Sequence, residues 1–496
     1  MKAFLMYPDR DFGPGLAVPA NADELTQDLE LDTLFDAMAR GDALVRKVAR
    51  IALLSSLVAP GEILYRQNIL SDCLRQPLVL RALFDPAGEA IAAEKAIFRS
   101  FFSERPETLL GRSVKVLEMF VGMLKRLRQL GDEHADQFSS EGFTRFYLML
   151  GTELDDDYFA VIEHHLTCLR FPEGQLTSVR LGEGNRGVDD VLREPREQNR
   201  GFFKRAPVKK PAYSMTIPDR DDNGLRALSD VRDRGLNVVA NAAAQSADHV
   251  LSFFTALRVE LAFYVGCLNL HEQLAGKGEP ACFPVPTAAG ERARSARGLY
   301  DPCLSLHLDG RAAGNDLDAN DKSLIMITGA NQGGKSTFLR SVGVAHLMLQ
   351  AGMFVAAETF SASVVRALFT HFKREEDATM TSGKLDEELS RMSDIADQIS
   401  PDCLLLCNES FAATNEREGS QIAREVVRAM VDGGITVFFV THLFDLGHSL
   451  YERPPGPALF LRAERESDGH RSYRIAEGEP LTTSYGQDLY TRIFQH

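Results

Sequence analysis

Apolar side chains recur every three or four residues through residues 1–130, which is the period of helices that pack on one face. The stretch 31–57 shows the pattern with a break at Gly41-Asp42. Prolines punctuate the helices that follow, and the same period continues through 114–124. We therefore predict that the first part of the chain is α-helical throughout.

The pattern weakens over 141–181 and then changes character. Residues 182–223 mix glycine, proline and charge, which predicts turns, short strands or an irregular excursion. Helical periodicity returns over 227–274 and indicates one long helical region, of the kind that forms arms or coiled coils.

Residues 277–298 carry prolines and glycines that suit a connector, and beyond them the pattern changes again. Short apolar runs now alternate with helical stretches, which is typical of an α/β sheet. The candidate strands are 323–328, 353–357, 367–372, 403–407, 435–440 and a last one around 473–476.

Composition narrows the class of protein. The chain has 496 residues, 44% of them hydrophobic, as in soluble proteins of several domains. Its apolar runs are far shorter than the ~20 residues that cross a membrane, and its start does not resemble a cleaved signal. We therefore expect a cytoplasmic protein without membrane contact.

The cysteine content and the net charge bear on disulfide bonding and on nucleic-acid binding. The seven cysteines are scattered and suggest no disulfide framework, and Cys403 and Cys407 are expected to be core thiols. The net charge of −15 gives no overall attraction to nucleic acid. Any binding of DNA would need a local basic patch.

The stretch 323–337, SLIMITGANQGGKST, combines an apolar strand, a glycine-rich turn and a helix start. Glycines let consecutive backbone N–H groups point at an anion, and the helix directs its positive dipole end to the same place. Lys335 would reach the β- and γ-phosphates, and the Ser336 hydroxyl would bind Mg²⁺. The pattern predicts a nucleoside triphosphate site formed by Gly329, Ala330, Asn331, Gln332, Gly333, Gly334, Lys335, Ser336 and Thr337.

Two later strands end in polar side chains that suit the same site. The run CLLLCNES ends in Asn408 and Glu409, and Glu409 would orient or deprotonate the attacking water. Asn408 would serve the Mg²⁺ shell only in part, since an amide carries no charge. His442 ends the run ITVFFVTH and could sense the γ-phosphate or the water.

Two other segments have alternative interpretations. Ser382, with Asp386 and Glu387 nearby, suits an N-terminally capped helix. A cluster of cations interleaved with aromatic residues suits phosphate binding and base stacking, although such a run can equally be a solvated loop. Its basic members are Arg200, Lys204, Arg205, Lys209 and Lys210.

Five motifs follow one another in the order and at the spacings of one known family: GANQGGKSTFLRSVG, AGMFVAAET, NESFAATNEREG, VTHLFDL and TTSYGQDL. In these motifs the chain resembles the MutS family of DNA mismatch repair ATPases. The specific resemblance covers Tyr300 to about Leu489. It implies a helical core, lever and clamp region followed by an α/β P-loop domain of ABC-like type. The implied boundaries are 1–135 for core and lever, 136–245 for the clamp, 246–285 for the returning lever helix and 286–496 for the ATPase domain.

The resemblance also implies roles for individual residues. ATP would be the nucleotide, Tyr300 would lie near the adenine, and Ser382 would act in trans in a composite dimer. The chain departs from the family at Asn408, where an Asp is usual, so slow hydrolysis is expected. It also begins near the family's core domain, so no mismatch-reading module is implied.

The expected function is a homodimeric, ATP-dependent clamp on duplex or branched DNA, with slow hydrolysis. A protein partner could supply recognition. Asn408 motivates an alternative, a non-hydrolysing scaffold gated by ATP. A third possibility is an ABC-like ATPase that acts on protein partners through its helical arms.

Overall fold

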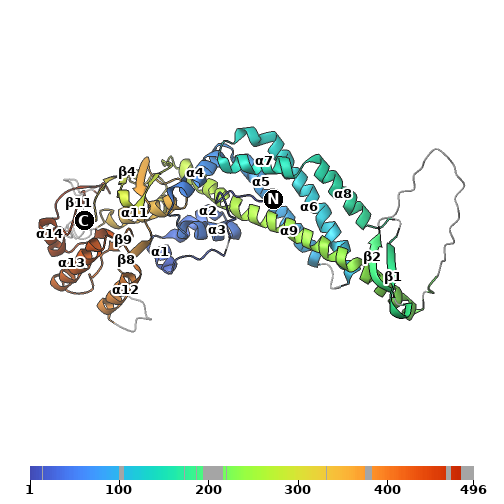
Figure 1. Cartoon of the computed structure of the whole chain (residues 1–496). Helices are drawn as coiled ribbons and strands as arrows, with labels where there is room; N and C mark the ends of the chain where they lie inside the picture. The colour runs from blue at the N-terminus through green and yellow to red at the C-terminus, as the bar shows by residue number, and fades with distance from the viewer. Residues whose placement is uncertain are drawn as a thin grey trace. The chain divides into compact units, whose positions relative to one another are not determined.

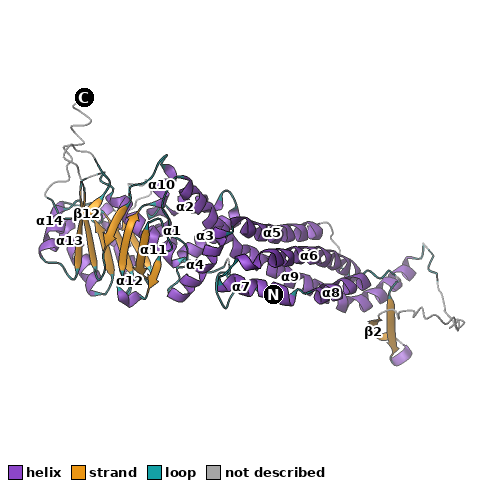
Figure 2. Ribbon diagram, turned by 90° about the horizontal axis from the view of Figure 1, so that it is seen from above, coloured by secondary structure: helices purple, strands orange, loops and turns teal. Residues whose placement is uncertain are grey.

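The structure is a computed structural model that describes residues 1–13, 15–99, 105–172, 174–185, 187–193, 216–218, 220–330, 332–374, 383–464 and 471–481. The chain divides into two compact units, whose elements are labelled in Figure 1 and coloured by type in Figure 2. The first unit comprises Met1–Ala3, Arg81–Phe138 and Thr144–Arg258, and the second comprises Phe4–Leu80, Ser139–Phe143 and Val259–His496.

The first unit is built from long helices and one antiparallel pair of strands. Phe120 of α6 and Phe254 of α9 pack with ring centroids 5.5 Å apart, which places apolar faces of both helices in one core. Its elements include most of α5 (Pro77–Arg99), α6 (Pro106–His134), η1 (Ala135–Gln137), most of α7 (Glu141–Glu153), α8 (Asp156–Leu169), β1 (Leu176–Leu181), η2 (Glu183–Asn185), β2 (Gly187–Arg193) and most of α9 (Asp222–Gly276).

Short helices form the first part of the second unit: α1 (Ala22–Asp28), α2 (Leu31–Ala39), α3 (Ala43–Leu54) and α4 (Pro60–Arg75). The predicted break at Gly41-Asp42 is confirmed. Gly41 has a φ of 90° after α2, and the Asp42 side chain accepts hydrogen bonds from the N–H groups of Leu44 and Val45 at the start of α3.

A six-stranded sheet forms the centre of the second unit, in the order β12-β11-β6-β10-β9-β8. Its strands are β6 (Leu324–Gly329), β8 (Leu368–Phe372), β9 (Leu404–Asn408), β10 (Thr436–Val440), β11 (Ala458–Ala463) and β12 (Ile475–Glu477). All except β12 run parallel, so the carboxyl ends of β6, β9 and β10 lie at one edge. The accompanying helices are α11 (Lys335–Gln350), α12 (Lys384–Gln398), α13 (Glu416–Asp432) and α14 (Phe444–Glu452).

A smaller sheet in the same unit has the order β3-β7-β4-β5. It consists of β3 (Val285–Thr287), β4 (Arg294–Leu299), β5 (Asn315–Asp318) and β7 (Thr359–Ser363), with η3 (Ala289–Glu291) and α10 (Pro302–His307) between them. None of these strands was predicted, because segments such as NDLD in β5 are short and polar.

Most of the predicted elements are confirmed, including the helical first part, the long helix α9 and five strands of the six-stranded sheet, whereas β11 was not predicted. The predicted strand 353–357 is wrong, since only Val355 forms an isolated bridge, with Cys282. This apolar run is buried by packing rather than by strand pairing. The predicted domain boundaries remain predictions.

Two expectations from composition can be compared with the structure. All seven cysteines are free, and Cys403 and Cys407 are buried, so the predicted core thiols are confirmed. Among the described helices, α9 is long and apolar enough to cross a membrane by length and composition, which the apolar runs in the sequence did not suggest. In the relevant window 67% of this helix is buried within the chain, as in a core helix of a globular protein.

Candidate nucleotide-binding site

The glycine-rich loop connects the end of β6 to the start of α11. Gly329 and Gly334 have φ values of 105° and 88°, a region that favours glycine. A Cβ on Gly333 would lie 2.7 Å from the Ala463 Cβ and 2.9 Å from the Ala330 carbonyl oxygen. The close packing of this loop therefore requires the glycines that the sequence provides.

Lys335 opens α11 and folds back over the loop. Its Nζ donates hydrogen bonds to the carbonyl oxygens of Gly329 at 3.0 Å and Ala330 at 2.9 Å. The side chain is buried, and that burial lowers the pKa of the ammonium group. Neither carbonyl carries a full negative charge, so an anion in the loop would be a stronger partner for this cation.

Ser336 and Asn408 meet at the same edge of the sheet. The Ser336 hydroxyl donates a hydrogen bond of 2.9 Å to the Asn408 Oδ1 at the end of β9. The two oxygens fit part of a Mg²⁺ shell, because Mg²⁺ in nucleotide sites keeps several waters and phosphate oxygens as ligands. Among the described residues no group of three or more His, Cys, Asp and Glu side chains could hold a metal ion by itself.

Glu409 and His442 lie at the same edge of the sheet, as their positions at two strand ends predict. The Glu409 Oε1 lies 3.8 Å from the His442 Nδ1, an electrostatic contact rather than a short hydrogen bond. The interaction with His442 is the largest cause that holds the pKa of Glu409 below its ordinary value, and the charges of Lys335 and Lys373 act in the same direction. Glu409 is therefore ionised at neutral pH.

A cavity of about 720 Å³ opens between the glycine-rich loop and the loops around Tyr300 and Tyr473. Tyr300 lines it, but the residue is only 2% exposed and its hydroxyl donates to the Pro280 carbonyl oxygen. Tyr473 is 53% exposed and lines the same cavity. Tyr473 was not predicted as a site residue, because its position depends on how β12 adds to the sheet.

Residues directly after α9 hold one wall of this cavity. Glu279 is buried and accepts hydrogen bonds from the Ser305 hydroxyl at 2.8 Å and the Ala312 N–H at 2.6 Å. The Lys277 Nζ donates to the Ser305 carbonyl oxygen at 2.7 Å. The end of the long helix is thus bonded to the loop that contains Ala312, which lines the cavity.

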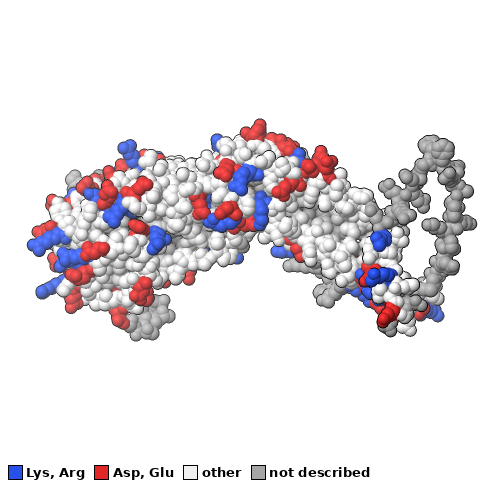
Figure 3. Space-filling view, in the orientation of Figure 1, with Lys and Arg blue, Asp and Glu red and all other residues white. Residues whose placement is uncertain are grey.

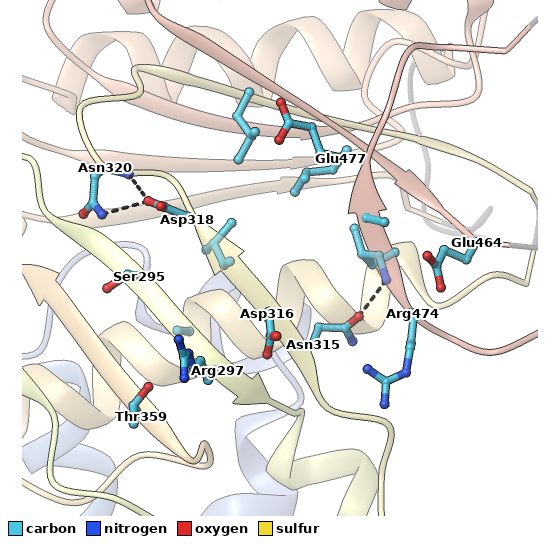
Figure 4. Close-up of a pocket in the computed structure, with 16 residues that line it drawn as sticks. Ser295, Arg297, Asn315, Asp316, Asp318, Asn320, Thr359, Glu464, Arg474 and Glu477 are labelled. Atoms are coloured by element: carbon cyan, nitrogen blue, oxygen red, sulfur yellow. Dashed lines mark hydrogen bonds between the residues drawn. The ribbon is translucent and has the colours of Figure 1, made fainter.

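A second cavity, of about 710 Å³, lies between the smaller sheet and the strands β11 and β12 (Figure 4). Its charged lining consists of four acidic and two basic side chains: Asp316, Asp318, Glu464, Glu477, Arg297 and Arg474. Its volume is similar, but neither the glycine-rich loop nor the start of α11 lines it. We therefore place the candidate nucleotide site in the first cavity. Asn315 borders both, and its Oδ1 accepts a hydrogen bond from the Ile475 N–H at 2.7 Å.

Several predicted site residues lie outside the described residues. They are Asn331, Ser382 and the basic cluster Arg200, Lys204, Arg205, Lys209 and Lys210. The helix start predicted near Ser382 is confirmed, but its N-cap is Gly383. On the face shown in Figure 3, acidic and basic side chains are interspersed over the described surface, so the described residues there form no extended basic patch.

Comparisons with known proteins match two family models to the chain. The MutS2 N-terminal domain matches residues 59–277, and MutS domain V matches residues 325–490. The second match contains the glycine-rich loop and the strand end with Asn408 and Glu409.

Similar curated proteins carry related names. The DNA mismatch repair protein MutS of Chloroflexus aurantiacus is 27% identical over 271 residues, covering 51% of this chain and 28% of the relative. DNA mismatch repair protein MutS 2 of Halobacterium salinarum is 30% identical over 177 residues, covering 35% and 20%. The chain spans less than a third of the length of these relatives. These matches show that the chain belongs to the MutS family.

Proposed function

We propose that this protein binds ATP with Mg²⁺ in the cavity beside the glycine-rich loop and hydrolyses it slowly to switch a homodimer around DNA. The observation that carries the proposal is the convergence of Lys335, the Ser336–Asn408 pair and Glu409 at one edge of the sheet. Triphosphate hydrolysis needs a cation, a metal-binding hydroxyl and a water-orienting group at one place.

The residues present fit the two ligands. The loop N–H groups and Lys335 would hold the phosphates, and Ser336 with Asn408 would hold Mg²⁺. Bound Mg²⁺ supplies neutralisation of the charge on the phosphates. Tyr473, with its exposed ring, would face the base, while the buried Tyr300 would form the wall behind it.

Glu409 would act on the attacking water. Its low pKa keeps the carboxylate charged, so it can accept a hydrogen bond from the water and orient it. His442 keeps the carboxylate at this edge of the sheet. Asn408 carries no negative charge, so it binds Mg²⁺ more weakly than a carboxylate would, and turnover is expected to be slow.

The dimer and the DNA contact rest on family membership and on residues outside the described part. Ser382 would complete the site of a second subunit, and the basic cluster at 200–210 would contact phosphates of duplex or branched DNA. The curated relatives are named as DNA mismatch repair proteins, which supports DNA as the molecule that the dimer binds. The bonds that Lys277 and Glu279 form directly after α9 would couple the nucleotide to the helical arm.

Charge reversal tests the DNA contact. Replacing Arg200, Lys204, Arg205, Lys209 and Lys210 by Glu should weaken binding of duplex DNA by at least about 100-fold at moderate salt, because each phosphate contact contributes to affinity. Replacing the same residues by Gln should have a smaller effect. Fluorescence anisotropy with labelled duplex and junction DNA gives the affinities. Unchanged affinity of the Glu variant would remove this cluster from the DNA-binding surface.

A second candidate function is a scaffold that binds ATP without hydrolysing it, and Asn408 favours it. Phosphate release by the wild type and by Glu409→Gln, with and without duplex DNA, separates the two functions. Hydrolysis predicts a slower Glu409→Gln variant at equal ATP affinity. Equal rates for the two proteins would favour the scaffold.

A further inference from the structure

The turn that carries Glu409 adopts a backbone conformation that its own residues disfavour. Glu409 and Phe411 have φ values of 53° and 62°, in the left-handed region, and neither is a glycine. Side chains in this region are strained, and the conformation persists only where surrounding contacts hold it. The contacts of this turn therefore determine where the Glu409 carboxylate points.

His371, a fully buried residue of β8, makes several of those contacts; the Glu388 carboxylate also accepts from the Phe411 backbone N–H, and the Glu409 N–H donates to the Val440 carbonyl oxygen. The His371 Nδ1 lies 2.7 Å from the Ser410 hydroxyl oxygen, which is also 2.8 Å from the His371 carbonyl oxygen. Its ring stacks on Phe411 with centroids 5.4 Å apart and planes at 25°. One imidazole thus holds both residues that follow Glu409.

The other ring nitrogen reaches a different element. The His371 Nε2 lies 3.0 Å from the carbonyl oxygen of Glu388 in α12. Arg391, one turn further along α12, donates from its Nη1 to the Phe372 carbonyl oxygen at 2.9 Å. The imidazole therefore bridges α12 and the turn after β9.

The hydrogen bonds define one protonation state. Burial is the largest cause that lowers the pKa of His371 to about 4, so the ring is neutral at neutral pH. The Glu388 carbonyl can only accept, so the ring proton lies on Nε2. Nδ1 is then an acceptor, and it shares the single proton of the Ser410 hydroxyl with the His371 carbonyl oxygen.

We propose that His371 is a positioning residue for the nucleotide site: it fixes the turn that carries Glu409 and ties that turn to α12. The direction of the carboxylate then depends on the position of α12, because the two elements share one rigid side chain. This proposal rests on the proposed hydrolysis of ATP and adds a regulatory contact to it.

The first test separates positioning from binding. His371→Phe keeps the ring against Phe411 but loses both hydrogen bonds, and Ser410→Ala loses only the hydroxyl. Each change is expected to lower kcat by about 10-fold to 100-fold, as small misplacements of catalytic groups do, while the Kd for ATP changes less than about 2-fold. The double variant should be no slower than His371→Phe alone, because both changes break the same link.

Two further variants serve as rescue and control. His371→Asn can still accept the Ser410 hydroxyl and should recover most of kcat. His346→Phe replaces another buried histidine, on α11, which bonds to the Val342 carbonyl oxygen rather than to the turn. A loss of kcat for His346→Phe as large as that for His371→Phe would assign the effect to general destabilisation and overturn the proposal. So would an unchanged kcat for His371→Phe.

A measurement without turnover distinguishes this proposal from the proposed function. If the wild type and Glu409→Gln release phosphate at equal rates, the proposed hydrolysis of ATP is wrong. Hydrogen exchange of the Glu409, Ser410 and Phe411 amides then tests whether His371 positions the turn. His371→Phe should then speed their exchange by at least about 10-fold, with unchanged exchange in β10. Unchanged exchange at these three amides would overturn the positioning role.

Discussion

Two turns lie at the candidate site. Both contain residues with left-handed backbone conformation, but the residue types that adopt it differ. The loop after β6 places Gly329 and Gly334 at positive φ, with Gln332 as its one other such residue among those described. The turn after β9 places Glu409 and Phe411 there. For a residue with a side chain this conformation costs about 1–2 kcal/mol, and glycine avoids the cost.

The shapes of the two turns therefore depend on different residues. The glycine-rich loop is specified by its own residues, so changes elsewhere should leave it intact. The turn after β9 depends on His371 and Ser410, so it should respond to changes in β8 and α12. A loop whose shape depends on its own glycines thus lies beside a turn whose shape depends on neighbouring elements.

The largest effect is expected from breaking the glycine-rich loop. Gly333→Val would bring a side chain within 2.7 Å of the Ala463 Cβ, so the loop would have to open. The Kd for ATP should rise by at least about 100-fold, measured by titration calorimetry. Gly290→Ala is a matched control, since nothing lies within 4 Å of its added Cβ. Normal ATP binding by Gly333→Val would contradict the close-packed cradle.

An intermediate effect is expected from changing the charge next to Ser336. Asn408→Asp keeps an oxygen for the Ser336 hydroxyl and adds a negative charge for Mg²⁺. The apparent affinity for Mg²⁺ should rise by about 10-fold, with faster turnover. Asn408→Ala should change both quantities in the opposite direction. If both variants match the wild type in Mg²⁺ titrations of the ATPase rate, residue 408 has no part in the metal site.

The smallest effect is expected on the pH dependence of the unfolding free energy. The pKa of His371 falls from 6.5 to about 4 in the folded protein, so the neutral ring stabilises the fold above pH 6.5 and this contribution is lost as the pH falls to 4. Relative to His371→Phe, the wild type should lose up to about 3 kcal/mol of unfolding free energy over that range. Denaturant unfolding across these pH values measures it. Parallel pH curves for the two proteins would show that His371 is not buried as a neutral ring.

The sequence predicted the site best where a residue's place follows from local features, such as glycine spacing in a loop or the end of an apolar strand. The cradle from Gly329 to Ser336 and the polar strand end at Asn408 and Glu409 could be predicted because glycine spacing and apolar runs specify them locally. Tyr473 could not, because β12 joins the sheet only through its pairing with β11.

His371 could not be predicted as part of the site either. Its role follows from the register of β8 on β9, which pairs it with Cys407, and no pattern in the chain shows that register. The smaller sheet was missed for a related reason. Its strands are short, and each contributes only one or two apolar side chains, such as Leu317 and Phe360, which are too few to show the alternation that marks a half-buried strand.

Phosphate release by the wild type and by Glu409→Gln, at ATP concentrations that saturate both proteins, tests most directly whether this site hydrolyses ATP. The two proteins should bind ATP with equal Kd, since the change keeps the shape of the side chain, and the wild type should release phosphate at least about 10-fold faster. Equal rates at equal occupancy would contradict hydrolysis by Glu409.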